Sequence, residues 1–426
     1  MNQQQQSNAK PSFTPYQTLV VAILALLQFT IILDFMVLSP LGTILIKDLN
    51  ISPTKFGWVV SAYAFSAGIS GVLAAGFADK YDRKKLLVLF YTGFLVGTLL
   101  CGLANDFHSL LIARIVTGVF AGVVGSASFA IITDLFPIQM RGRVMGFVQM
   151  AFAGSQVLGI PIGIKLANAW GWHSTFLMIV GFGLLLGIVI VLYLKPVTEH
   201  LKLKLDRNPL QHLLHTLTNK QYLVGFLGTM LLATGGFMLM PFASTFNTNN
   251  LGISQEDLPL IFLITGCSSL ITMPLIGKLS DKIDKYIVFC IGTVISMVMI
   301  GIYTHLGPTS LTVLIIINVI MFSGIMSRMI PATTLTSGIP DPQDRGAFMS
   351  INSSVQQVSG GIASVIAGHI IVENKDKSLA HFDTVGYVTM AAMVVAAVIM
   401  YFVNRQVVAK VQHTSVPKPV GEALAT

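Results

Sequence analysis

The chain has 426 residues, of which 54% are hydrophobic and only 10% are charged, whereas about 25% are charged in a typical soluble protein. Its formal net charge is +8 at pH 7. So few charged side chains cannot cover a soluble globule of this size. The composition therefore excludes a soluble enzyme, a nucleic-acid-binding protein and a disordered chain, and it predicts a protein that crosses a membrane several times.

Twelve apolar runs of the sequence are long enough to cross a bilayer, which takes about 20 residues per helix. They lie at about 18–46, 56–77, 86–104, 108–133, 144–168, 174–194, 221–245, 258–277, 287–306, 310–337, 346–372 and 384–403. The polar start, Met1 to Phe13, precedes a run that is too long for the core of a cleavable signal peptide.

Basic residues are distributed unequally between the two sides of the predicted membrane. With both termini in the cytoplasm, 19 of the 26 Lys and Arg residues lie in inner loops and tails, and only 4 lie in outer loops. Cytoplasmic loops of membrane proteins carry such an excess of positive charge. The bias predicts an integral multi-pass protein of the plasma membrane, which is the inner membrane in a bacterium, with both termini cytoplasmic.

A basic polar stretch divides the spans into two groups of six. The predicted organisation is a cytoplasmic tail at 1–17, a six-helix bundle at 18–195, a cytoplasmic linker at 196–220, a second six-helix bundle at 221–403 and a cytoplasmic tail at 404–426. The bundles repeat one another, since residues 75–84 align with 277–286 at an offset of 202. Such a duplication predicts two pseudo-symmetric halves with a substrate site between them, near the middle of the membrane.

The loop after the second span carries the most specific motif. Residues 75–84, AGFADKYDRK, resemble the signature G-x-L-A-D-R-x-G-R-K of the major facilitator superfamily, with Ala75 and Asp82 in place of the two glycines. The resemblance implies a cytoplasmic charge latch that holds the halves together in the outward-open state; the alternative is ordinary basicity of an inner loop. The residues predicted for this latch are Asp79, Arg83, Lys84, Asp134, Arg141, Arg143 and Asp281.

Two further stretches resemble motifs of the same family. In the fourth span Arg114 is followed four residues later by Gly118, as in the family's second signature. The fifth span resembles the glycine–proline motif of drug:proton antiporters and arabinose-efflux-type permeases, and plain helix packing is the alternative explanation. The residues of this antiporter-type motif are Gly154, Gly159, Pro161 and Gly163.

Asp34 is the only carboxylate predicted to lie deep in the bilayer. At 1.5 Å per residue, Asp34 and Arg114 differ by about 9 Å in depth, a gap that an extended arginine and helix tilt can bridge. Ionisable groups at such depth are seldom left without a partner or a function. We predict that Asp34 binds the coupling proton and that Arg114 tunes its proton affinity; an anchor for a cationic substrate and a structural ion pair are the alternatives.

Other polar or adaptable side chains in the spans are candidates for a substrate cavity. Arg328 has no acidic residue at similar depth in its own half, which favours an anionic substrate group; alternatively it bonds carbonyls freed by Pro331 or reaches the cytoplasmic surface. The remaining candidates, for which helix-to-helix contacts or lipid-facing packing are the alternatives, are Gln149, Gln156, Phe237, Met238, Asn352 and Gln356.

Together these features predict an all-α membrane protein with the twelve-helix major facilitator fold, and a monomer. The sequence has no ATP-binding loop, so we expect an ion gradient as the energy source, no cofactor and no metal. No catalytic constellation is visible, which argues against an enzyme. The predicted function is proton-coupled export of a small amphipathic or polar compound, such as a drug, sugar or metabolite, by alternating access. A proton-coupled importer of a sugar or organic anion is the alternative, followed by a non-transporting sensor.

Overall fold

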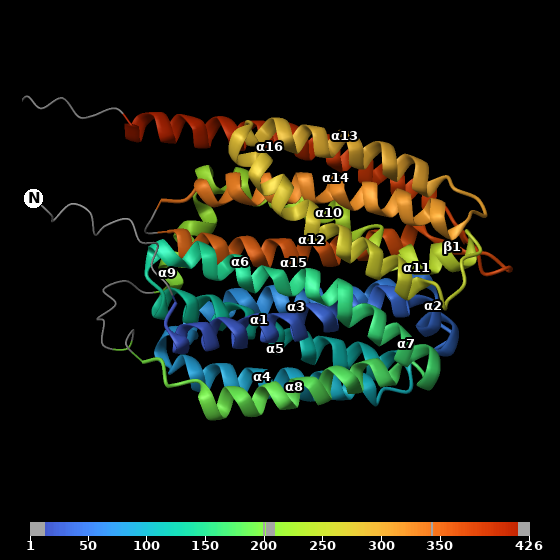
Figure 1. Cartoon of the computed structure of the whole chain (residues 1–426), viewed down its shortest axis with the longest axis horizontal. Coiled ribbons are helices and arrows are strands. Elements are labelled where there is room, and N and C mark those ends of the chain that lie inside the picture. Colours follow the sequence, from blue (N-terminus) through green and yellow to red (C-terminus); the bar gives the residue numbers. More distant parts are fainter. Residues whose placement is uncertain (1–12, 199–200, 202–208, 342–343, 416–426) are drawn as a thin grey trace, which may run out of the picture.

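The computed structural model describes residues 13–198, 201, 209–341 and 344–415. Within these ranges it is all-helical apart from one antiparallel hairpin of β1 (Val372–Glu373) and β2 (Leu379–Ala380). The helices run back and forth along one axis (Figure 1). We call the end where α1 begins and α16 ends the inner end, and the opposite end the outer end, after the orientation that the basic residues predict.

The N-terminal half contains eight α-helices and two short helical segments of other types. They are α1 (Pro15–Met36), α2 (Leu38–Asp48), α3 (Pro53–Phe77), the 3₁₀ helix η1 (Ala78–Lys80), α4 (Arg83–Gly102), α5 (Phe107–Leu135), α6 (Ile138–Gly154), the π-helix η2 (Ser155–Gly159), α7 (Ile160–Trp170) and α8 (His173–Tyr193).

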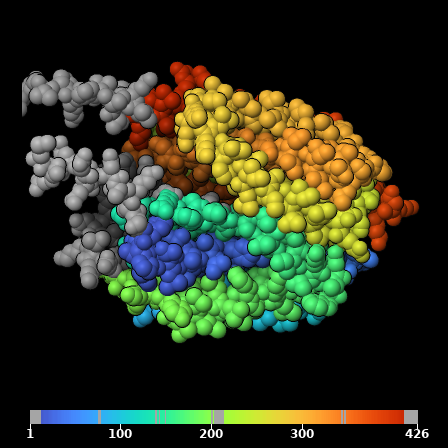
Figure 2. Space-filling model, in the orientation of Figure 1, coloured from blue at the N-terminus to red at the C-terminus, as the bar shows by residue number. Residues whose placement is uncertain are grey.

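The helix α9 (Pro209–Thr218) connects the halves, and the C-terminal half after it follows the same plan. Its helices are α10 (Lys220–Phe237), α11 (Met240–Asn249), α12 (Leu258–Lys282), α13 (Lys285–Thr304), α14 (Leu311–Gly338), α15 (Arg345–Ile370) and α16 (Phe382–Ser415). Figure 2 shows the two halves side by side, the first in blue to green and the second in yellow to red.

The first span of each half is interrupted at the same place in the repeat. The predicted run 18–46 is two helices, α1 and α2, joined at Val37, and the run 221–245 is likewise α10 and α11. A proline lies in the first turn of each second segment, Pro40 in α2 and Pro241 in α11. Proline fits the first turn of a helix, where its missing N–H has no intrahelical partner to lose.

Among the described residues, eleven segments are long and apolar enough to cross a membrane, judged by length and composition. Together with α15 they correspond to the twelve predicted spans. α15 has the length but is more polar, with Asn352, Gln356 and Gln357 in its middle. It packs along α3 of the other half and along α10. A helix at a seam between bundles meets protein on more of its surface than a lipid-facing helix does, so it tolerates these polar side chains.

Aspartates at the inner end begin two helices in equivalent positions. Asp82 caps α4, its Oδ1 accepting from the N–H of Lys84 at 2.9 Å, and Asp284 caps α13 by accepting from the N–H of Tyr286 at 2.8 Å. Asp82 Oδ1 also accepts from the N–H of Val197 at 3.0 Å. The aspartate that replaces a signature glycine therefore has a local structural role as a helix cap.

The two halves meet closely along α3 and α15. A Cβ at Gly57 would lie 2.8 Å from the carbonyl oxygen of Ser364, so the two helices touch backbone to backbone. Hydroxyl groups reinforce the seam: Thr54 donates to the carbonyl of Gly368 at 2.7 Å, and Ser61 to that of Gly361 at 2.8 Å.

At the outer end the halves also meet through α2 and α11. Ser39 donates to the carbonyl of Met240, and the rings of Phe56 and Phe242 lie 5.7 Å apart. A small hollow at this seam, lined by Phe35 and Phe237 among others, has a volume of about 10 Å³, about enough for one water. The structure is therefore closed between the halves at the outer end.

Candidate functional site

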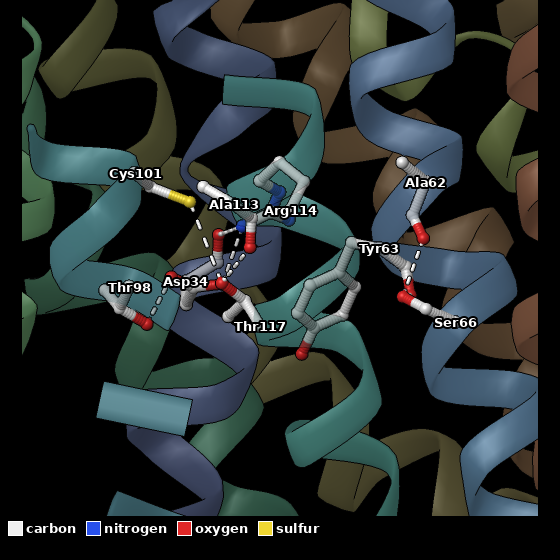
Figure 3. Close-up of polar contacts among 9 residues, drawn as sticks. All are labelled: Asp34, Ala62, Tyr63, Ser66, Thr98, Cys101, Ala113, Arg114 and Thr117. Carbon is white, nitrogen blue, oxygen red and sulfur yellow. Dashed lines mark hydrogen bonds and ion pairs between the residues drawn. The ribbon is translucent and has the colours of Figure 1, made fainter. Parts of the chain in front are cut away.

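Asp34 and Arg114 form a direct ion pair inside the N-terminal half. Arg114 Nη1 lies 2.7 Å from Asp34 Oδ2, and both side chains are 0% exposed. Thr98 of α4 donates to the other carboxylate oxygen, Oδ1, at 3.1 Å. Figure 3 shows the carboxylate between the threonine and the guanidinium, so that groups from α1, α4 and α5 converge on it.

Asp34 and Arg114 are in contact although their predicted depths in the membrane differ by about 9 Å. That estimate treats the first span as one straight helix, whereas the structure interrupts it at Val37, three residues after Asp34. Arg114 also reaches the carbonyl oxygen of Asp34, at 3.4 Å. The broken helix and the long arginine side chain together bring the charges into contact.

Close helix packing holds Arg114 in place, and glycines make it possible. A Cβ at Gly97 of α4 would lie 2.8 Å from Cα of Thr117 in α5, and a Cβ at Gly118 would lie 2.5 Å from the carbonyl oxygen of Tyr63 in α3. Gly118, the glycine of the arginine motif, thus lets α3 lie against α5. Small residues at such contacts are the usual means by which membrane helices approach.

Tyr63 completes the surroundings of the ion pair and was not predicted from the sequence. Its ring centroid lies 4.4 Å from Arg114 Cζ, a cation–π geometry. Among the described residues its hydroxyl has no hydrogen-bond partner, and neither do Nε and Nη2 of Arg114. In the sequence Tyr63 lies between Ala62 and Ala64, and nothing there distinguishes it from other tyrosines of the spans.

The Asp34 carboxyl group has two states in which its charge is compensated. With the pair formed, the carboxylate and the guanidinium neutralise each other. With the arginine turned toward another acceptor, a proton on Asp34 would neutralise the carboxylate, because an unpaired charge in an apolar interior is very costly. The spare donors of Arg114 give it the capacity to bind a second partner.

The residues predicted for the latch cluster at the inner end, where their contacts join elements of the N-terminal half. Arg83 Nε pairs with Asp134 Oδ2 at 3.0 Å, Lys84 donates to the carbonyl of Val191 at 2.8 Å, and Arg141 donates to that of Phe136 at 2.9 Å.

The remaining latch residues make other contacts or lie outside the description. Arg143 lies 4.6 Å from the ring of Phe13, and Asp281 is exposed at the end of α12. The side chain of Asp79 lies outside the described part of the structure. The latch is predicted for the outward-open state, whereas this structure is closed at its outer end, and its role between the halves stays a prediction.

The antiporter-type motif lies around the π-helix of the fifth span. A Cβ at Gly159 would lie 2.5 Å from Cδ1 of Leu33, next to Asp34, and one at Gly163 would lie 3.2 Å from Val37. Gly154 faces Phe29 more loosely, at 3.6 Å. The motif therefore packs span five against α1 beside the ion pair.

Pro161 is the second residue of α7, two positions after the end of η2 at Gly159. π-Turns are common at functional sites, and a proline there removes an N–H from the helical ladder. These contacts support the explanation that the motif serves helix packing. A role of the motif in antiport stays a prediction.

The predicted cavity residues do not form a single cluster. Phe237 lies at the seam between the halves, with its ring 5.5 Å from that of Phe35, and Met238 is completely buried. Lipid-facing packing of these two residues, an alternative from the sequence, is therefore wrong. Asn352 instead accepts a bond from Thr229 at 2.7 Å inside the C-terminal half.

The three glutamine candidates differ in their surroundings. Gln156 is buried on η2 at the contact with α12, and its Oε1 has no hydrogen-bond partner among the described residues. Gln356 is half-buried on α15. The side chain of Gln149 lies outside the described part of the structure.

Arg328 is buried within the C-terminal half, only 2% exposed. Its Nε donates to Thr293 Oγ1 at 3.2 Å, and its Cζ lies 5.6 Å from the ring centroid of Phe289. Its Nη2 has no partner among the described residues. Arg328 therefore does not reach the surface, and within the described part of the chain it makes no hydrogen bond to a carbonyl oxygen, so both of these alternatives are wrong.

The described residues contain no group of three or more His, Cys, Asp or Glu side chains that could hold a metal ion.

Comparison with known proteins places the whole chain in one family. The family model described as "Major Facilitator Superfamily" matches residues 24–232 and again residues 225–424, one match per half. Over 384 residues the chain is 24% identical to the uncharacterized MFS-type transporter YbcL of Bacillus subtilis, covering 89% of this chain and 95% of that protein. It is 34% identical to Multidrug resistance protein 3 of Bacillus subtilis over 170 residues, which cover 40% of this chain and 33% of that protein.

Solved structures show the same fold. A bacterial homolog of the human lysosomal transporter Spinster, in an inward-facing and unoccupied conformation, matches with a TM-score of 0.73 at 17% identity, covering 93% of this chain and 99% of that chain. A D-xylose–proton symporter matches with a TM-score of 0.73 at 19% identity, covering 91% of this chain and 97% of that chain. With both halves matched by the family model, the chain belongs to the Major Facilitator Superfamily and is a secondary membrane transporter, not an enzyme.

Proposed function

We propose that this transporter exports a small amphipathic or polar compound in exchange for protons, and that Asp34 binds the coupling proton. The observation that carries the proposal is the fully buried ion pair between Asp34 and Arg114, at 2.7 Å. Among the described span residues, Asp34 is the carboxylate that lies deep in the bundle. In pumps and transporters, acidic side chains within the membrane are the usual groups that bind and release protons.

The pair can couple proton binding to movement because Arg114 has alternatives to Asp34. The guanidinium keeps the Tyr63 ring at 4.4 Å and has two spare donors, Nε and Nη2. When the arginine turns to another acceptor, the carboxylate loses its counter-charge and binds a proton. When the arginine returns, the proton leaves. Each proton event thus accompanies a change in the contacts between α1 and α5.

The position of Asp34 links this event to the seam between the halves. Asp34 lies three residues before the interruption of the first span at Val37, and α2 after it packs on α11. Ser39 of α2 donates to the carbonyl of Met240 across the seam. A shift of α1 at Asp34 therefore acts directly on a contact that closes the outer end.

Export of drug-like compounds is supported by relatives rather than by a visible cavity. Multidrug resistance proteins 2 and 3 of Bacillus subtilis are both similar in sequence to this chain, and the fifth span carries the antiporter-type motif. We place the protein in the plasma membrane with both termini cytoplasmic, on the distribution of basic residues.

Proton-coupled import of a sugar or organic anion is the second candidate. Arg328 favours it, because its Nη2 is buried without a partner among the described residues. A substrate carboxylate would satisfy this donor and neutralise the charge. The side on which substrate accumulates when a pH gradient is imposed on vesicles separates the two directions of transport.

The test uses purified protein in proteoliposomes with a panel of drug-like fluorescent cations, organic anions and sugars. Asp34→Asn should lose accumulation driven by a pH gradient while keeping exchange of substrate across the membrane without a gradient, because the asparagine cannot carry a proton. The control is Asp341→Asn, which removes a carboxylate from an exposed ion pair with Lys410 at the inner end. Undiminished gradient-driven accumulation by Asp34→Asn contradicts the assignment.

A further inference from the structure

An apolar groove of about 380 Å³ runs between α4 and α8 on the outside of the N-terminal half. The two helices lie along one long edge of the molecule (Figure 1). Its walls are apolar side chains such as Val88 and Leu95 of α4 and Leu184 of α8, and Gly187 leaves space between them. The groove faces away from the seam between the halves, so it lies at membrane depth on the lipid side of the bundle.

Lysines gather where this groove reaches the inner end. Lys84 donates to the carbonyl of Val191, a residue of the groove wall, at 2.8 Å. Lys85 is exposed beside it. Lys195 is also exposed, just after α8, and its Nζ lies 5.0 Å from the ring centroid of Tyr16. Lys84 thus places one ammonium group at the inner end of the groove, and Lys85 and Lys195 are exposed near it in the sequence, at the start of α4 and just after α8.

The described acidic groups nearby, Asp82 and Asp134, do not cancel this charge. Asp82 Oδ1 accepts hydrogen bonds from the backbone N–H groups of Lys84 and Val197, and Asp134 forms an ion pair with Arg83. Among the described residues of this segment, Asp82 is therefore one carboxylate against Lys84, Lys85 and Lys195, which leaves a net positive charge.

We propose that the groove between α4 and α8 is a binding site for an anionic phospholipid, with one acyl chain in the groove and the phosphate headgroup on Lys84, Lys85 and Lys195. The apolar walls match an acyl chain, and the cations lie where the interface with its headgroups would be. Basic pockets between membrane helices on the cytoplasmic side select anionic headgroups in this way. The lipid would hold α4 against α8, next to the loop that carries the predicted latch. The proposal needs only that the bundle spans a membrane, and it does not depend on proton coupling by Asp34.

The test measures lipid retention by the purified full-length protein. The protein is equilibrated with phosphatidylglycerol and phosphatidylcholine of identical acyl chains in equal amounts, and the bound lipids are counted by native mass spectrometry. The wild-type protein should retain phosphatidylglycerol preferentially. Lys85→Gln and Lys195→Gln should each lower the ratio of the two lipids by about 5-fold, since a lysine near a headgroup contributes on that scale.

A second pair of variants tests the groove separately from the charge. Gly187→Leu should lower retention of both lipids, because a Cβ there meets Tyr91 only at 3.9 Å and the rest of the leucine extends into the groove. Gly181→Leu is the matched control, since Gly181 is exposed on the same helix with nothing within 4 Å of its Cβ position.

Lys278→Gln with Lys282→Gln is the charge control, because it removes two cations from the inner end of the other half. The proposal is overturned if the wild-type protein binds both lipids equally, or if this control lowers the ratio as much as the groove lysines do. The lysine variants alter exposed side chains, so this arm stays decisive even where Gly187→Leu disturbs folding.

Discussion

The ion pair between Asp34 and Arg114 predicts a strongly non-additive double-mutant cycle. Both side chains are 0% exposed and 2.7 Å apart, so each single substitution leaves an uncompensated charge in the bundle. Breaking a buried pair by removing one partner costs about 3–5 kcal/mol, whereas replacing both partners costs far less. The double variant Asp34→Asn/Arg114→Gln should therefore be more stable than the sum of the single losses implies, with a coupling of at least about 2 kcal/mol.

The two single variants should also differ from each other. In Asp34→Asn the guanidinium keeps the Tyr63 ring at 4.4 Å, a contact that stabilises a desolvated cation by up to about 2 kcal/mol. In Arg114→Gln the carboxylate keeps the hydroxyl of Thr98 and loses its counter-charge. Arg114→Gln should thus be the less stable single variant at pH 8. The loss of stability of Arg114→Gln relative to the wild-type protein should be smaller at pH 5, because burying a protonated carboxyl costs less free energy than burying a carboxylate.

Denaturant titration of the four proteins in the same detergent, at pH 5 and pH 8, measures these differences. Asp341→Asn serves as the reference for removing an exposed carboxylate. Losses that simply add in the double variant would refute the reasoning, because they would mean that the pair is not energetically coupled in the folded protein. A deficit of Arg114→Gln that does not change with pH would show that the lone carboxyl does not bind a proton in the bundle.

Three further predictions concern packing, the seam and a helix cap. Gly97→Val should reduce the free energy of unfolding by about 1–3 kcal/mol and so lower the midpoint of thermal unfolding, because its Cβ would lie 2.8 Å from the α5 backbone. Gly125→Ala should leave the midpoint unchanged, because the space at its Cβ position is open. Gly57→Val should open the outer seam, since its Cβ would lie 2.8 Å from a carbonyl of α15, and distances between spin labels on the two halves at the outer end should lengthen. Hydrogen bonds from the backbone N–H and hydroxyl of Ser109 hold the pKa of Asp106 below its ordinary value, so its stabilisation of α5 is present at neutral pH and is lost as acid protonates the carboxylate. Asp106→Ala should lower the unfolding midpoint at pH 7, and this difference should become smaller as the pH falls below the ordinary pKa of an aspartate.

Much of the fold could be predicted because membranes impose simple rules on sequence. Apolar runs, the excess of inner basic residues and the repeat at an offset of about 202 follow from bilayer thickness, loop charge and gene duplication. The paired prolines, Pro40 and Pro241, mark the interruptions of the first and seventh spans. These features depend on local composition, so they can be predicted from the sequence without knowing which helices pack against each other.

The contacts of the site were harder to predict, because they depend on which helices meet. The sequence pointed to Asp34 and Arg114 but not to Thr98 or Tyr63, since a threonine or tyrosine in a span is ordinary until its neighbour is known. The cavity candidates show the same limit. Asn352 and Gln356 are four residues apart on one helix, yet Asn352 is bonded to Thr229 inside one half, and nothing in the sequence separates the two.

The duplicated architecture supplies an internal comparison for the ion pair. At the offset of 202 Asp34 corresponds to Gly236, and since α14 begins 204 residues after α5, Arg114 corresponds to Asn318. Gly236 is exposed with nothing within 4 Å of its Cβ position, and Asn318 donates to its own helix at Leu314. The C-terminal half therefore repeats the order of the spans with neither charge at these two positions. Because the scaffold does not require the pair, and because burying two charges brings little net stability over an apolar replacement, its presence in one half alone supports the proposal that Asp34 and Arg114 serve proton coupling.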